Sequence, residues 1–173
     1  MRIVPLALLA LACSAGCDTT ETQETSPATP LTVSARAPVF ADRTKQVTYD
    51  HGKARLGTIR TILLSPGLSP AQTAELGFEC ASLRSDRDAV AAEQDPIVVR
   101  FVADVDKTCG LDVPLATAYA ELRAIDAKRV SGASLKSECL GLKVALGDFA
   151  PKYLSNPEVT EVGGKYATFC RSE

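Results

Sequence analysis

The sequence is poor in the residues on which many functional classes depend. Its 173 residues include no tryptophan, one methionine at the start and one histidine, His51. A single histidine excludes metal sites built from several imidazoles. Lysine and arginine number 19 against 21 acidic residues, and no stretch concentrates the basic ones, so we predict no nucleic-acid partner. No run of about 20 apolar residues occurs, so we predict no membrane-spanning helix.

Common catalytic motifs are also missing from the sequence. It contains no G-x-S-x-G, S-x-x-K or H-E-x-x-H, and no C-x-x-C-H for covalent haem attachment. Tyr49 and Lys53 form a Y-x-x-x-K spacing similar to that of short-chain dehydrogenases, but the glycine fingerprint of a Rossmann fold is absent. We therefore predict no catalytic residue, no metal and no cofactor, with His51 as a solvated loop residue.

The first residues have the pattern of an export signal. Met1 and Arg2 are followed by the apolar run "IVPLALLALA" and then by small residues, which is typical of a secretory signal peptide. A cysteine after small residues, here Cys17, resembles the lipobox of bacterial lipoproteins. The resemblance covers residues 1–17 and implies that this cysteine is acylated after cleavage. Cys13 is the rival position.

The number of cysteines favours Cys17 as the lipidated residue. If Cys17 becomes the new N-terminus, Cys13 is removed with the signal, and four cysteines remain to pair fully. If Cys13 is acylated instead, Cys17 is left as an odd thiol in an oxidising compartment. Ordinary secretion as a soluble form, with cleavage near residues 15–16, is the alternative to lipidation.

Composition then divides the chain into three parts. Residues 1–16 are the predicted signal peptide. Residues 17–37 hold the lipidated cysteine and a tether, rich in threonine and proline ("DTTETQETSPATP"), that has too few apolar residues to fold. Residues 38–173 form the predicted helical domain.

Signals for helix starts recur along this domain. Ser69, Pro70 and Gln72 form a capping box with proline at the first helical position. Further helices are predicted to begin at Asp95-Pro96, Asp112, Ser134 and Asn156-Pro157, with Gly110 as a helix end. A strand remains open for residues 97–109 because of their β-branched content. Residues 52–65 are ambiguous between a helix and looser structure.

The four downstream cysteines lie on the apolar faces of these helices. Cys80 and Cys109 lie at similar separations before and after Pro96, and the second pair lies in the same way around Pro157. Helices that fold back at these prolines bring equal heights together, because the rise per residue is constant. The long gaps between the cysteines do not suit a zinc site. We therefore predict an all-α, disulfide-clipped bundle of four to five helices, with disulfides Cys80–Cys109 and Cys139–Cys170.

These features together predict a membrane-anchored bacterial lipoprotein on the periplasmic or cell-surface side. Its expected role is non-catalytic binding of an envelope protein or ligand that the sequence does not identify. An envelope enzyme with a hidden site is the first alternative. The second is a small periplasmic chaperone, because "LSPAQ" (68–72) resembles the LTxxQ motif of that family. Converging ionisable groups with strongly shifted pKa values would favour the enzyme.

Overall fold

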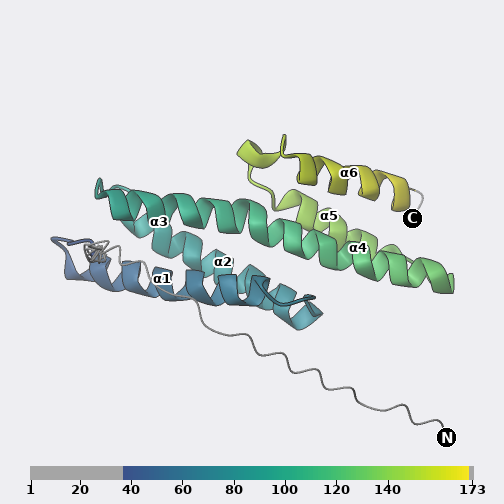
Figure 1. Cartoon of the computed structure of the whole chain (residues 1–173), viewed down its shortest axis with the longest axis horizontal. Coiled ribbons are helices and arrows are strands. Elements are labelled where there is room, and N and C mark those ends of the chain that lie inside the picture. Colours follow the sequence, from purple (N-terminus) through teal and green to yellow (C-terminus); the bar gives the residue numbers. More distant parts are fainter. Residues whose placement is uncertain (1–36, 172–173) are drawn as a thin grey trace, which may run out of the picture. The chain divides into compact units, whose positions relative to one another are not determined.

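The computed structural model describes residues 37–171; the predicted signal peptide, Cys17 and residues 18–36 of the predicted tether lie outside them. The domain is all-α, with no strand among the described residues (Figure 1). Its six α-helices are α1 (Arg43–Leu63), α2 (Pro70–Val90), α3 (Pro96–Lys107), α4 (Val113–Ser131), α5 (Lys136–Gly147) and α6 (Pro157–Phe169). A π-helical turn, η1 (Thr108–Asp112), joins α3 to α4 without a break, and a short 3₁₀ turn, η2 (Pro151–Tyr153), precedes α6. Residues 37–171 therefore form five continuous helical rods, within the predicted range.

Three of the predicted helix starts are confirmed by their hydrogen bonds. Ser69 Oγ accepts from the amide of Gln72 at 3.2 Å, and Gln72 Oε1 accepts from the amide of Ser69 at 3.0 Å, which completes the capping box. Asp95 and Asn156 each accept from the amide two residues further on, at 2.8 and 2.9 Å. Each cap is local in sequence, so the pattern alone was sufficient to predict it.

Two other expectations about helix ends are wrong. Gly110 does not end a helix but lies within η1, and Asp112 is helical and makes no capping bond. The start expected at Ser134 is one residue off: Leu135 occupies the N-cap position of α5, while Ser134 Oγ accepts from the amide of Lys136 at 3.4 Å. The strand alternative for residues 97–109 is also wrong, because the segment is helical, and the ambiguous residues 52–65 are helical up to Leu63, after which a turn begins. Gly132, the one described glycine with positive φ, ends α4 instead.

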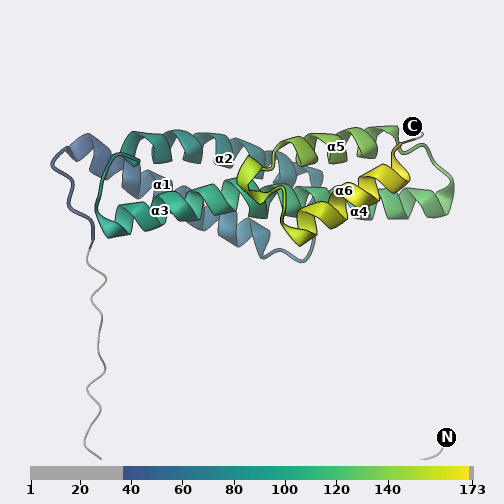
Figure 2. The same cartoon turned by 90° about the horizontal axis from the view of Figure 1, so that it is seen from above.

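The helices form two groups of three, each with its own apolar core. Helices α1–α3 enclose one buried cluster, which includes Leu56, Leu83 and Val105, and helices α4–α6 enclose the other, which includes Leu122 and Leu142. Figure 2 shows the first group along the α3 half of the long continuous rod and the second group along the α4 half. Burial of these two apolar clusters is the main contribution to the stability of the fold.

Each group carries one disulfide between its second and third helices. Cys80 on α2 is bonded to Cys109 in η1, and Cys139 on α5 is bonded to Cys170 at the end of α6. These are the two pairs that the proline-centred spacing predicts, and the Cα atoms of both pairs are 5.5 Å apart. All four cysteines are buried. Disulfides of this kind indicate an oxidising environment reached by export.

The two groups also repeat an ion pair beside the disulfide. Glu79, which precedes Cys80, contacts Arg55 on α1 at 2.9 Å. Glu138, which precedes the first cysteine of the second group, contacts Lys128 on α4 at 2.7 Å. In both groups, a glutamate and a cysteine are thus adjacent in the sequence. The glutamate forms an ion pair with the preceding helix, and the cysteine forms a disulfide with a cysteine further along the chain.

Candidate binding groove

A cavity lies where the two groups of helices meet. It has a volume of about 420 Å³ and is lined by α2, α4 and α5, including Thr73, Gly77, Thr117, Glu121 and Gly141. A second hollow of about 300 Å³ shares Thr73 and Glu121 with the first. We call the two together the α2/α5 groove. Concave sites of this size with a few polar groups are typical of binding sites.

Small residues keep this groove open. A Cβ added at Gly77 would meet no atom within 4 Å, so the α2 wall leaves free space there. Along α4 the lining runs from Val113 to Ala124, a distance of about 16 Å at 1.5 Å per residue. That length corresponds to about three helical turns. The lining is therefore elongated along α4.

Glu121 is the main charged group on α4 in the groove. Its carboxylate packs against α5 where Gly141 has no side chain, since a Cβ there would lie 2.6 Å from Glu121 Oε1. Burial raises the pKa of Glu121, and the nearby carboxylate of Glu138 raises it further. Among the ion pairs of residues 37–171, none includes Glu121. A cation placed in the groove would therefore find an uncompensated carboxylate.

Glu138 lines the same end of the groove as Glu121, but its pKa is shifted in the opposite direction. The hydrogen bond from Lys128 holds the pKa of Glu138 below its ordinary value. The side chain of Glu138 is 13% exposed, and its Oε2 atom is buried without a hydrogen-bond partner within the described residues. Glu138 is thus an ionised carboxylate whose charge is paired with that of Lys128 at this end of the groove.

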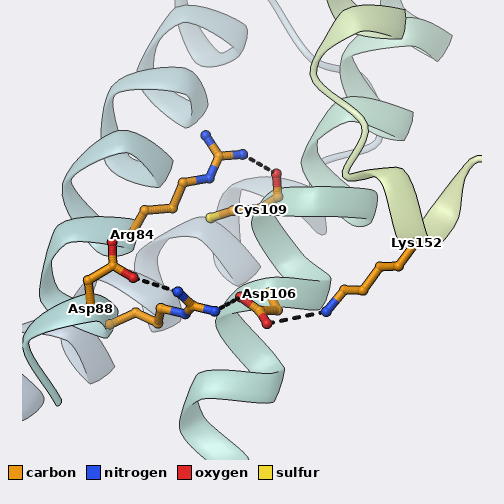
Figure 3. A network of polar contacts seen from close by, with 6 residues as sticks. Arg84, Asp88, Asp106, Cys109 and Lys152 are labelled. Carbon is orange, nitrogen blue, oxygen red and sulfur yellow. Dashed lines mark hydrogen bonds and ion pairs between the residues drawn. The ribbon is translucent and has the colours of Figure 1, made fainter. Parts of the chain in front are cut away.

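The π-turn η1 forms the opposite end of the groove and is held by contacts from two directions. Arg84 on α2 donates to the carbonyl oxygen of Cys109 at 2.7 Å (Figure 3). The amide of Ala150 donates to the carbonyl oxygen of Gly110 at 3.0 Å. A Cβ on Gly110 would lie 2.9 Å from the Cβ of Ala150. Glycine is therefore needed here for close approach of the 150–153 segment, and not for a helix stop.

An ion-pair network beside η1 connects the two groups of helices. Asp106 on α3 accepts from Arg87 on α2 at 3.0 Å and from Lys152 of η2 at 3.2 Å (Figure 3). The hydrogen bond with Asp106 raises the pKa of Lys152. This network fixes η2 against α3. It therefore supports the η1 end of the groove but does not line its larger cavity.

The residues that the sequence singled out lie elsewhere. Cys17 is outside the described residues. His51 is exposed, as predicted, but it lies on helix α1, so its assignment to a loop is wrong. Tyr49 is buried, with Lys53 Nζ 5.6 Å from its ring centre. Leu68–Gln72 forms the start of α2, where the capping box accounts for its serine and glutamine.

Neither a metal cluster nor a membrane-spanning helix is present in the part of the chain that the structure describes. No group of three or more histidine, cysteine or acidic side chains there could hold a metal ion. No helix there is both long and apolar enough to cross a membrane.

The groove itself was not predicted from the sequence. The sequence contains only a weak indication of the groove. Thr117, Ala120 and Ala124 are small residues beside the apolar face of α4, and Gly141 lies within α5, two residues after Cys139. Such residues become a site only when two other helices flank them. The lining has hydroxyls, carboxylates and the guanidinium of Arg84, and its two cysteines are joined in a disulfide.

Comparison with known proteins gave no relatives: no family model, curated protein or solved structure matches this chain.

Proposed function

We propose that this chain is a membrane-anchored bacterial lipoprotein whose helical domain is a non-catalytic binding module of the cell envelope. The α2/α5 groove is the observation that carries the binding role. It combines about 420 Å³ of open space with an uncompensated, partly buried carboxylate at Glu121. Lipidation at Cys17 and a position on the periplasmic or surface side are the parts of the proposal that come from the signal sequence.

Intact mass under non-reducing conditions tests the anchor. Protein extracted from membranes should have the mass of a chain that starts at an acylated Cys17 and contains two disulfides. The Cys17→Ser chain should lose the lipid mass and leave the membrane fraction, while both disulfides still form. An unmodified wild-type chain that is fully soluble would refute anchoring.

Site-specific photo-cross-linking in intact cells tests the binding role. A photoreactive residue at Val144, which lines the groove, should give a defined adduct. The matched control is Val130 on α4, which is 92% exposed and does not line the groove. Absence of an adduct at Val144, or equal adducts at both positions, would refute the groove as the binding surface.

A further inference from the structure

Helix α5, one wall of the groove, also presents an unusual outer face to solvent. Lys136, Leu140, Lys143 and Val144 follow spacings of four, three and one, which place them on one side of the helix. Leu140 is 63% exposed and Val144 is 58% exposed. Neither lysine takes part in an ion pair within residues 37–171. The face thus combines two large exposed apolar side chains with two uncompensated positive charges.

The neighbouring groove has the complementary character. Its lining supplies the carboxylates of Glu121 and Asp148 and the guanidinium of Arg84, so acidic side chains outnumber basic ones there, and no ion pair among the described residues includes any of the three. Gly77 leaves free space on the α2 wall, whereas the carboxylate of Glu121 fills the space beside Gly141. A helix that enters the groove can therefore come close to the backbone of the α2 wall. An apolar helix face flanked by lysines would complement the carboxylates and the open space of the groove.

We propose that a second copy of this chain supplies that face, with α5 of each copy lying in the α2/α5 groove of the other. Because α5 borders the groove, the donor face and the acceptor groove belong to one continuous patch. Such a patch satisfies the requirement of a twofold interface, in which the same surface is used by both subunits. Leu140 and Val144 enter the partner's groove, and Lys143 approaches the carboxylate of Glu121. The inference rests on the proposed role of the groove as a binding surface.

Membrane anchoring makes a modest affinity sufficient for this contact. Two chains tethered to one membrane surface meet at a high effective concentration, which strengthens a weak interaction without new contacts. In solution, the same contact should appear only as the protein is concentrated. The Cys17→Ser chain makes this measurement possible because it carries no lipid.

Sedimentation velocity of the Cys17→Ser chain from micromolar to about millimolar concentration is the decisive experiment. We expect reversible association to twice the monomer mass. Leu140→Glu or Val144→Glu should weaken dimerisation at least about tenfold, because each places a charge in the interface. These side chains are exposed in the monomer, so folding should be unaffected. Val130→Glu is the matched control and should leave the dimer unchanged.

A double-mutant cycle tests the proposed contact between Lys143 and Glu121. Lys143→Glu should weaken the dimer in the chain that keeps Glu121, because it opposes two carboxylates. The same change should cost less in a Glu121→Gln background. Equal losses in both backgrounds would overturn the Lys143–Glu121 pairing.

Two results would overturn the inferred self-association without refuting the proposed binding function. One is a monomer at every concentration, and the other is a dimer equally sensitive to changes at Val130 and Val144. In intact cells, the adduct at Val144 should have twice the mass of the chain. An adduct with a different protein would support a binding module and refute self-association, whereas lack of acylation at Cys17 would refute the anchor alone.

Discussion

Removal of one disulfide should cost several kcal/mol of folding free energy. Cys80 and Cys109 are 29 residues apart, and the chain-entropy relation for a closed loop of that length predicts a loss of about 3.6 kcal/mol when both are replaced by alanine. Cys139 and Cys170 are 31 residues apart, so their loss should be nearly equal, about 3.7 kcal/mol. A domain of this size is stable by only about 5–15 kcal/mol, so removal of both pairs should leave it barely folded or unfolded.

Urea unfolding of the Cys17→Ser chain, followed by circular dichroism at about 25 °C, measures these losses. The two pairs lie in separate apolar clusters, so their individual costs should add to within about 0.5 kcal/mol where both can be measured. Hydrogen exchange should show where each acts: loss of Cys139–Cys170 should release α6 while α1 and α2 stay protected. A cost below about 1 kcal/mol for either pair would refute the chain-entropy reasoning.

Three smaller changes test the local features of the fold by thermal or urea unfolding at low protein concentration. Ser69→Ala should cost about 1 kcal/mol through loss of the α2 cap, whereas Ser85→Ala at an exposed site within α2 should be almost neutral; equal effects would contradict the capping role. Gly110→Val should destabilise by about 1–3 kcal/mol through overpacking against the 150–153 segment, whereas Gly147→Ala meets no atom and should be neutral or slightly stabilising. Glu121→Gln should stabilise the chain at pH 7, because the raised pKa of Glu121 means that folding disfavours the ionised carboxylate. This gain in folding free energy should fade as pH falls toward the ordinary glutamate pKa of 4.5. A gain that grows in acid would refute the burial argument.

The sequence predicted the helix starts that depend on near neighbours. The caps at Ser69, Asp95 and Asn156 each join groups two or three residues apart, so their residue pattern was sufficient. Predictions failed where a distant segment intervenes. Gly110 looks like a helix end, but it lies within a π-turn, where its carbonyl oxygen accepts from the amide of Ala150, which is remote in the sequence.

The sequence by itself determined the helical class, the positions of most helices and the two cysteine pairs, because periodicity, capping and equal rise per residue are local or additive along the chain. Lipidation at Cys17 also follows from the sequence and stays a prediction. Only the tertiary structure decided that α3 and α4 form one rod, with separate apolar cores on its two halves. It alone brings Glu121 together with Gly77 and Gly141, which lie on other helices, because a groove exists only where separate helices pack against a third.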